Sequence, residues 1–163
     1  MKRKMIALAV GLVLTVCAGA WGSVAINETN FPDSVFRSYV KGRFDVDSND
    51  IFSDEELAQG LIISVQDMRI SSLAGIEYFT TMTQLWCSGN QLTSLDVSKN
   101  TALTHLGCWD NQLTELDVRS NTALVELHTE GNQLTSLDVT QNTQLTWLSC
   151  NSNNLTGTLD LDR

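Results

Sequence analysis

Hydrophobic residues recur with a period of 21 positions through the second half of the chain. In the copy that begins at Leu103, apolar residues stand at Leu106 and Leu113, and Asn111 lies between them. Four copies aligned at this period give five columns of like residues: Met82/Leu103/Leu124/Leu145, Leu85/Leu106/Leu127/Leu148, Cys87/Cys108/Thr129/Cys150, Asn90/Asn111/Asn132/Asn153 and Leu92/Leu113/Leu134/Leu155. Apolar and polar positions alternate at strand spacing, and no stretch of the repeat has helical periodicity. The pattern predicts a solenoid of stacked, β-rich coils.

Each copy also contains a shorter internal repeat. The segment Leu113-x-x-Leu116-x-Val118-x-x-Asn121 follows the pattern of residues 103–111 at a spacing of ten. We therefore expect two short strands in every coil. A weaker copy lies 22 residues before the first full one, at Ile63, Val65, Ile70 and Leu73. The prediction is about five coils over residues 61–163.

The shared pattern L-x-x-L-x-(L/C)-x-x-N-x-L is the leucine-rich repeat signature. We predict a right-handed leucine-rich repeat solenoid, which convention counts as α/β although this chain is β-rich. After Leu155 the pattern shifts by one residue at Gly157, and the sequence ends within a coil at Arg163. We therefore expect no C-terminal cap and an open edge, through which copies of the chain can assemble.

Three columns have candidate chemistry, and each also has a structural interpretation. An inward asparagine hydrogen-bonds the backbone of its turn and of the next coil, so we assign the asparagines to the scaffold. We interpret the cysteines as small buried side chains, because a Cys87–Cys108 disulfide would join side chains that point the same way. The outward aspartates either bind cations as a stripe or, as we favour, cap turns: Asp96, Asp117, Asp138 and Asp160.

Residues 1–25 have the layout of a secretion signal. Lys2, Arg3 and Lys4 precede an apolar run over 5–16, and small residues suited to cleavage stand at 18–20, while cleavage after Gly22 or Ala25 is equally compatible. The run is short for a bilayer span and no later stretch is a candidate, so we expect no transmembrane segment and a secreted or cell-surface location. Cys17 lies in a loose lipoprotein box, but Val16 before it makes lipid anchoring the weaker alternative.

The mature chain is strongly acidic. Without the three basic residues of the leader, seven basic residues face nineteen acidic ones, a formal net charge of −12. Binding to phosphate backbones requires clustered cations, so nucleic acid is excluded as a partner.

Residues 26–60 lack the repeat and predict a helix-loop-helix cap. Pro32 suits a first helical turn, and Val35, Phe36, Tyr39 and Val40 form one apolar face. The acidic loop that follows aligns with a twelve-residue EF-hand loop. Six of its residues match ligand positions in register, Ile51 through its backbone carbonyl: Asp45, Asp47, Asn49, Ile51, Ser53 and Glu56.

The departure from the EF-hand pattern is Asp50, which stands where the sharp turn normally takes glycine. Aspartate tolerates the left-handed conformation better than most residues. We expect weakly bound calcium in a structural role, with a metal-free helix-loop-helix cap as the alternative.

Three segments carry a family resemblance. Ile26-Asn-Glu-Thr-Asn-Phe-Pro-Asp33 with Phe36-Arg-Ser-Tyr-Val40 precedes the repeats, Leu73-Ala-Gly-Ile-Glu-Tyr-Phe79 begins them, and Asn90-Gln-Leu-Thr-Ser-Leu-Asp-Val-Ser-Lys-Asn100 is a full unit. They resemble bacterial secreted leucine-rich repeat proteins of the 21-residue nested class, internalin-like in plan. The resemblance covers nearly all of the mature chain and implies its fold and export. It implies no particular partner, because such proteins bind varied partners.

The outward positions of the first strand differ from coil to coil and are the candidate ligand-binding surface. They bring together tryptophans, histidines and acids: Trp86, His105, Trp109, Asp110, Glu126, His128, Glu130 and Trp147. Outward tryptophans mark binding sites, or else they cover neighbouring side chains. We favour a protein ligand, with an extracellular glycan stacked on the rings or self-assembly through the open edge as alternatives.

We do not expect an enzyme. The chain has two histidines and no G-x-S-x-G or H-E-x-x-H motif, which leaves no nucleophile and base pair. His105, Glu126 and His128 fall on adjacent coils, but nothing in their spacing requires zinc.

Overall fold

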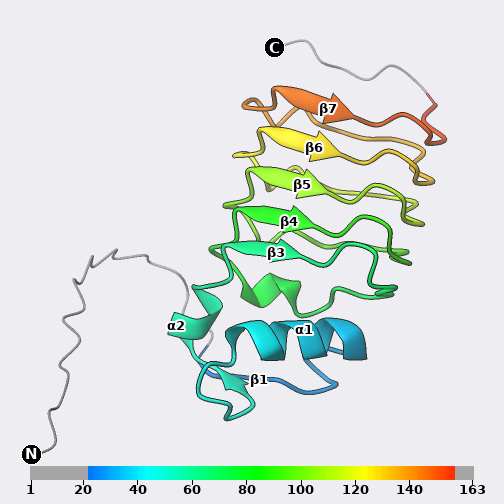
Figure 1. The fold of residues 1–163 in the computed structure, drawn as a ribbon. Helices are drawn as coiled ribbons and strands as arrows, with labels where there is room; N and C mark the ends of the chain where they lie inside the picture. The colour runs from blue at the N-terminus through cyan, green and yellow to red at the C-terminus, as the bar shows by residue number, and fades with distance from the viewer. Residues whose placement is uncertain (1–21, 157–163) are drawn as a thin grey trace, which may run out of the picture.

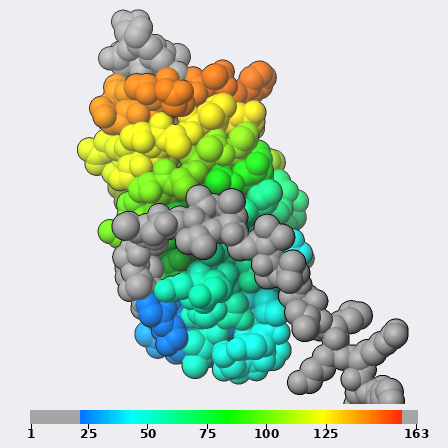
Figure 2. All heavy atoms as spheres, turned by 90° about the vertical axis from the view of Figure 1, so that its left-hand side faces the viewer, coloured from blue at the N-terminus to red at the C-terminus, as the bar shows by residue number. Residues whose placement is uncertain are grey.

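The computed structural model describes residues 22–156, which form a cap and a stack of coils (Figure 1). One parallel five-stranded sheet runs the length of the stack in chain order. Its strands are β3 (Ile62–Ser64), β4 (Gln84–Trp86), β5 (His105–Gly107), β6 (Glu126–His128) and β7 (Trp147–Ser149). The space-filling view shows the coils as successive layers, each lying between its sequence neighbours (Figure 2). The predicted leucine-rich repeat solenoid is confirmed.

The prediction of two strands per coil is wrong, because each described coil carries one. The second halves of the coils contain no strand within residues 22–156. Between the coils that hold Leu92 and Gln112, the Gln112 N–H donates to the Leu92 carbonyl at 2.9 Å. The next link is made by a side chain, since the Leu92 N–H donates to Asn111 Oδ1 at 3.0 Å. Side chains therefore replace the ladder that would define a second strand.

Buried asparagines hold neighbouring coils together. Asn111 Nδ2 donates to the Cys87 carbonyl of the preceding coil at 3.0 Å and to the Cys108 carbonyl of its own coil at 3.1 Å. Asn132 repeats both bonds one coil later. A second column, Asn100, Asn121 and Asn142, donates to carbonyls of the preceding coil at 2.8–3.0 Å. The structure thus gives both asparagine columns a scaffold role.

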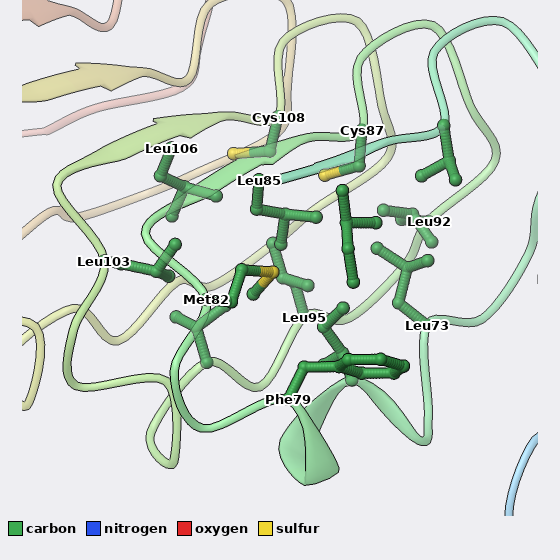
Figure 3. Close-up of a cluster of buried hydrophobic side chains, with 14 of the residues drawn as sticks. Leu73, Phe79, Met82, Leu85, Cys87, Leu92, Leu95, Leu103, Leu106 and Cys108 are labelled. Atoms are coloured by element: carbon green, nitrogen blue, oxygen red, sulfur yellow. The ribbon is translucent and has the colours of Figure 1, made fainter. Parts of the chain in front are cut away.

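Inward apolar side chains form one continuous core along the stack. Figure 3 shows Leu85 beside Leu106 and Met82 near Leu103, with Phe79 at the cap end of the cluster. All five side chains are fully buried. Each coil covers the apolar face of the next, which is why the coils fold together rather than singly.

The inward cysteines form a column of free thiols. Cys87 and Cys108 are buried, Cys150 is half-buried, and no disulfide joins them. Their sulfur atoms point the same way in Figure 3, the parallel arrangement that disfavours a bridge. Burial raises the pKa of both buried thiols, that of Cys108 to about 12, where the Glu130 carboxylate adds to the effect. These thiols are therefore core side chains with little thiolate character.

The cap consists of two short strands and two helices below the first coil. Strand β1 (Val24–Ala25) pairs antiparallel with β2 (Ile51–Phe52), so Val24 lies opposite Phe52. Helix α1 (Ser34–Phe44) and the four-residue helix α2 (Asp54–Leu57) flank the acidic loop. A 3-10 helix, η1 (Ile76–Tyr78), follows in the first coil. Strand β1 falls within the range that the sequence assigns to the leader.

Aromatic packing and one carboxylate join the cap to the repeats. Phe52 lies between Phe31 and Phe79, with ring centroids 5.7 and 5.8 Å away. Asp33 caps helix α1 by accepting from the Val35 and Phe36 N–H groups, and its other oxygen accepts from the Ser71 N–H at 2.9 Å. Burial alone would raise the pKa of Asp33, but these hydrogen bonds lower it. The same carboxylate thus caps a helix and anchors the first coil.

The signal-peptide prediction falls mainly on residues 1–21, and Asp160 and the expected open C-terminus fall on residues 157–163. Both stretches lie outside the described residues. Across residues 22–156, no helix has the length and apolarity needed to cross a bilayer.

Replacing Asn111 with alanine removes two donors and leaves the Leu92 N–H without its acceptor. We expect the free energy of unfolding in urea to fall by about 1–3 kcal/mol, the cost of an unsatisfied buried polar group. Gln112→Ala is the matched control, because its side chain is exposed on the same coil. Equal effects of the two substitutions would contradict the scaffold role.

Candidate functional site

The candidate surface consists of the outward side chains of strands β4 to β7 and of the residues that follow each strand. We call it the strand face. The register aligns Gln84, His105, Glu126 and Trp147 in one column and Trp86, Gly107, His128 and Ser149 in the next. Inward leucines alternate with these residues, so the core fixes which side chains face outward.

Three rings of the strand face pack together over strand β5. The ring centroid of Trp86 lies 6.2 Å from that of Trp109 and 6.1 Å from that of His128, and Trp109 and His128 are 5.9 Å apart. The interplanar angles at Trp109 are 70° and 66°, the edge-to-face geometry that aromatic pairs favour. His105 and Trp147 extend the cluster, with centroids 6.3 and 6.4 Å from their neighbours. The structure thus joins five predicted residues into one aromatic cluster.

Gly107 makes this cluster possible, and sequence reasoning did not include it in the site. It lies between Trp86 and His128 in the register, where a larger side chain would stand. A Cβ atom built on Gly107 would lie 2.5 Å from ring atoms of both Trp86 and Trp109. The feature of the sequence that could have identified it is a glycine in a column that otherwise carries side chains, directly before the Cys108-Trp109 pair.

Two interpretations of the outward tryptophans follow from the sequence, as a binding surface and as cover for neighbouring side chains. The structure shows features of both. Trp86 and Trp109 are half-buried and cover neighbouring side chains as well as facing outward. Trp147 is 59% exposed, the most exposed of the large apolar side chains on the strand face. Packing and surface presentation therefore coexist in this cluster.

Acidic side chains lie beside the rings. Glu126 stands between the two histidines, 3.8 Å from His105 Nε2 and 3.5 Å from His128 Nε2. Glu130 follows His128 on the next outward position, and its Oε2 atom is buried without a hydrogen-bond partner. The cluster thus combines aromatic rings with two carboxylates of one coil, one at the start of β6 and one just after its end.

Asp110 belongs to the turn after β5 rather than to the strand. Its φ is 53°, and the equivalent residues of the other coils, Asp67, Gly89, Gly131 and Ser152, are also left-handed. A Cβ on Gly131 would collide with the Asp110 carboxylate, and one on Gly89 with that of Asp67. Aspartate and glycine therefore alternate in this column because the carboxylate of one coil occupies the space beside the next.

The acidic loop of the cap gathers three of its six predicted ligands. Within the described residues, one set of three acidic, histidine or cysteine side chains has ligand atoms within 4.8 Å of one another: Asp45, Asp47 and Glu56. His105, Glu126 and His128 are not such a set. Asn49 lies in the same loop and donates from Nδ2 to Asp47 Oδ2 at 2.7 Å, while its Oδ1 accepts from the Ile51 N–H.

Glu56 connects this loop to helix α2. Oε2 accepts from the Ser53 N–H at 3.0 Å and Oε1 from the Val46 N–H at 2.8 Å, and Ser53 Oγ accepts from the Glu56 N–H in return. Hydrogen bonds from the Ser53 and Val46 backbone lower the pKa of this buried carboxyl. Glu56 is therefore held ionised and directed into the loop.

The loop backbone has the turn that the EF-hand alignment requires. Asp50 has a φ of 64°, the left-handed conformation expected at the glycine position. Its carboxylate pairs with Lys41 of helix α1. Its carbonyl accepts from the Ile26 N–H at 2.9 Å, which ties the loop to the chain after β1.

The outward aspartates cap turns, as the favoured interpretation holds. Asp96, Asp117 and Asp138 each accept from the backbone N–H two residues on, at 2.9–3.0 Å. A groove of about 600 Å³ runs along them on the second halves of the coils. Arg119 pairs with Asp117 there, and its hydrogen bonds lower the pKa of Asp117 to about 2.

Substituting Gly107 with alanine should separate the Trp86–Trp109 pair, since the new methyl group overlaps both rings. We expect the exciton-coupled circular dichroism of the two indoles to weaken strongly. Gly42→Ala in helix α1 is the control, because no atom lies within 4 Å of its Cβ position. An unchanged indole spectrum for Gly107→Ala would show that the rings do not pack over this glycine.

Comparison with known proteins finds similarity to internalins. No known family model matches the sequence. Internalin J of Listeria monocytogenes serotype 4b (strain F2365) is 43% identical over 71 residues, which are 44% of this chain and 8% of that protein. Internalin J of serovar 1/2a (strain ATCC BAA-679 / EGD-e) is 44% identical over an equal length. The chain thus matches a small fraction of these curated relatives.

Two solved structures share the fold. The functional domain of InlJ from Listeria monocytogenes, described as including a cysteine ladder, is 41% identical with a TM-score of 0.76, covering 84% of this chain and 30% of that one. The internalin InlF of strain 4b F2365 is 22% identical with a TM-score of 0.67, covering 82% and 47%, and supports the fold alone. Cys87, Cys108 and Cys150 form a cysteine column in this chain as well. The chain therefore has a leucine-rich repeat fold, and over the matched segments it is similar to internalin J.

Proposed function

We propose that this chain is an exported, non-catalytic protein-binding module whose strand face docks a protein. The observation that carries the proposal is the aromatic cluster, which continues across four coils from Trp86 to Trp147. Aromatic side chains dominate the energetics of protein interfaces, where they supply large contact areas with few rotatable bonds. Similarity to internalins, although it covers a small part of their length, supports a role in surface interaction.

The ring geometry favours a protein over a glycan. Sugars stack on broad, accessible ring faces, whereas Trp86 and Trp109 are half-buried and meet edge to face. Trp147 is the one ring of the cluster that is more than half exposed. A glycan-binding role would therefore depend on Trp147, and a protein-binding role on the whole cluster.

Export is proposed from the leader-like residues 1–21 together with the structure of the cap. Val24 is buried and strand β1 pairs with β2. Removal of a leader that ends after Ala25 would delete this strand. Cleavage at or before Gly22 keeps it, and we propose that boundary.

Replacing Trp109 with alanine should weaken capture of the partner from the native extracellular milieu by about tenfold or more, the effect of losing an interface hot spot. A Trp147→Ala variant separates the alternatives, because a glycan ligand depends on it most. Both are compared with Glu115→Ala, an exposed residue on the second half of its coil.

Sedimentation of the same samples tests self-assembly through the last coil. A mass that rises with concentration, together with capture that is unchanged in Trp109→Ala, would contradict docking on the strand face. A glycan array on which binding requires only Trp147 would replace the protein ligand by a sugar.

We also propose that the acidic loop binds calcium in a structural role. Three points support this: the carboxylates of Asp45, Asp47 and Glu56 converge, Glu56 is held ionised, and the left-handed turn stands at Asp50. Oxygen ligands of this kind suit a hard cation, and crowded carboxylates repel one another without one. Bound calcium would stiffen the loop that links α1 and α2, next to the first coil.

Adding a chelator should lower the melting temperature of the wild-type protein and leave that of Asp45→Asn unchanged. The reason is that a ligand bound only by the folded state stabilises it by an amount that grows with the logarithm of the free ligand concentration relative to its Kd. Asp54→Asn, an exposed acid outside the set of three, is the matched control and should keep the calcium response. A wild-type melting temperature that changes with neither chelator nor added calcium would show that the cap binds no calcium.

A further inference from the structure

The chain has two histidines, and both lie on the strand face beside one carboxylate. Glu126 and His128 stand two residues apart on β6 and point to the same face, while His105 of β5 is the register partner of Glu126. Positions related in this way are about 5 to 7 Å apart, within reach of one another's side chains. The strand register therefore holds two imidazoles and a carboxylate around one patch of surface.

The contacts among these three side chains have the spacing of ligands around a small ion. His105 Nε2 lies 3.8 Å from Glu126 Oε1, and His128 Nε2 lies 3.5 Å from Glu126 Oε2. Ligand atoms about 2 Å from a tetrahedral ion are about 3.4 Å from one another. The three residues do not yet bring one ligand atom each within 4.8 Å of the other two. Since the side chains of Glu126 and His105 are 40% and 28% exposed, they have room to rotate and close the remaining gap.

A hydrogen bond with Thr104 determines which nitrogen of His105 is available to an ion. The Thr104 hydroxyl donates to the Thr83 carbonyl at 3.0 Å, and its oxygen lies 2.8 Å from His105 Nδ1. A hydroxyl has one hydrogen, so the Thr104 oxygen accepts from Nδ1–H. In its neutral form His105 therefore keeps the hydrogen on Nδ1 and directs the lone pair of Nε2 toward Glu126.

The threonine column supports this direction of the hydrogen bond. Thr83 and Thr146 hold the equivalent position in other coils, and each donates to a carbonyl of the preceding coil, at 3.1 and 3.2 Å. Neither is followed by a histidine, so donation to the carbonyl does not depend on the contact with His105. A lone pair that faces a carboxylate gains nothing until a cation joins the two acceptors.

No basic side chain of the described residues supplies that cation. Within residues 84–151 the lysine and arginine are Lys99 and Arg119, and both are exposed on the second halves of their coils. Trp86 packs against both histidines, with ring centroids 6.3 and 6.1 Å away. An apolar wall of this kind limits the access of water to a metal site.

We infer that the two histidines and Glu126 bind a divalent transition-metal ion such as zinc, with Thr104 as the residue that positions His105. Imidazole nitrogens suit zinc, nickel and copper, whereas calcium and magnesium prefer oxygen ligands. A ligating histidine is usually oriented through a hydrogen bond from its other nitrogen, as His105 is here. The site lies on the repeats and is separate from the acidic loop of the cap, and it does not depend on the docking of a protein.

The test measures zinc binding to the full chain, without an added histidine tag, by calorimetry in excess calcium. Calcium competes for the oxygen ligands of the acidic loop but not for imidazole. Histidine ring signals in nuclear magnetic resonance report on this site alone, because the chain has two histidines. Zinc should shift the ring signals of both, and calcium should shift neither. Ring signals that zinc leaves unchanged would overturn the inference.

Glu126→Gln keeps the size of the side chain and removes its charge. It should weaken zinc binding at least tenfold, since even residues that only orient a ligand change metal affinity by roughly that much. Glu115→Gln removes the same charge from an exposed position on the second half of its coil and should change the affinity by less than about twofold. Equal zinc affinities of Glu126→Gln and the wild type would mean that zinc binds elsewhere, and would also overturn the inference.

Thr104→Val tests the positioning role, and the fold accommodates valine there, because Val125 holds the equivalent position of the next coil. Thr146→Val is the matched control, since it loses the same bond to the preceding coil without a histidine beside it. Zinc affinity should fall roughly tenfold in Thr104→Val and less than about twofold in Thr146→Val. The melting temperatures without metal should fall by similar amounts in the two variants. Equal zinc affinities of the two variants would contradict the positioning of His105 by Thr104.

Discussion

The fold depends on the hydrogen bonds that join successive coils, because a single coil cannot cover its own apolar side chains and needs its neighbours to do so. The sheet supplies these bonds through the three-residue strands β3 to β7. Elsewhere in the coil fewer backbone groups bond directly to the backbone of the neighbouring coil. Buried asparagine side chains supply hydrogen bonds there instead. Asn90, Asn111, Asn132 and Asn153 each accept an N–H of the preceding coil and donate to its carbonyls. The leucine columns are buried only because these contacts keep the coils in register.

Because inward residues form the scaffold, the strand face is free for recognition. Inward leucines and asparagines satisfy the scaffold, so outward residues of β4 to β7 can differ from coil to coil without loss of the fold. Gly107 has no side chain at such an outward position, and the indole rings of Trp86 and Trp109 pack over the space. Glu126 lies between the two histidines, and Glu130 forms no ion pair among the described residues. A surface built this way is stiff, aromatic and acidic.

The parts that sequence predicted well are those that a period of 21 dictates. An inward column takes residues of similar size and polarity in nearly every coil, so the leucines, cysteines and asparagines identified the solenoid and its core. The second strand was wrongly predicted because periodicity reports which way a side chain points. It does not report whether the backbone bonds to a neighbouring strand or to an asparagine. Burial on alternate positions is the same in both cases.

The site was harder to predict, since its residues are those that break the repeat. Sequence selected the tryptophans, histidines and acids, and the register brings the rings together. It missed Gly107, because an absent side chain has no chemistry until its neighbours are placed. It placed Asp110 with the ligand surface, although the left-handed turn explains that residue. The calcium ligands, chosen by position in a loop, remain a prediction.

Asparagine side chains take the place of a second strand in holding the coils together. Native-state hydrogen exchange measured amide by amide tests this role most directly. The N–H groups of Leu92, Leu113 and Leu134 donate to Asn111, Asn132 and Asn153. These amides should exchange as slowly as those of strands β4 to β6, because all of them open only when the coils separate. Exchange as fast as that of exposed turn amides in the same coils would contradict this role.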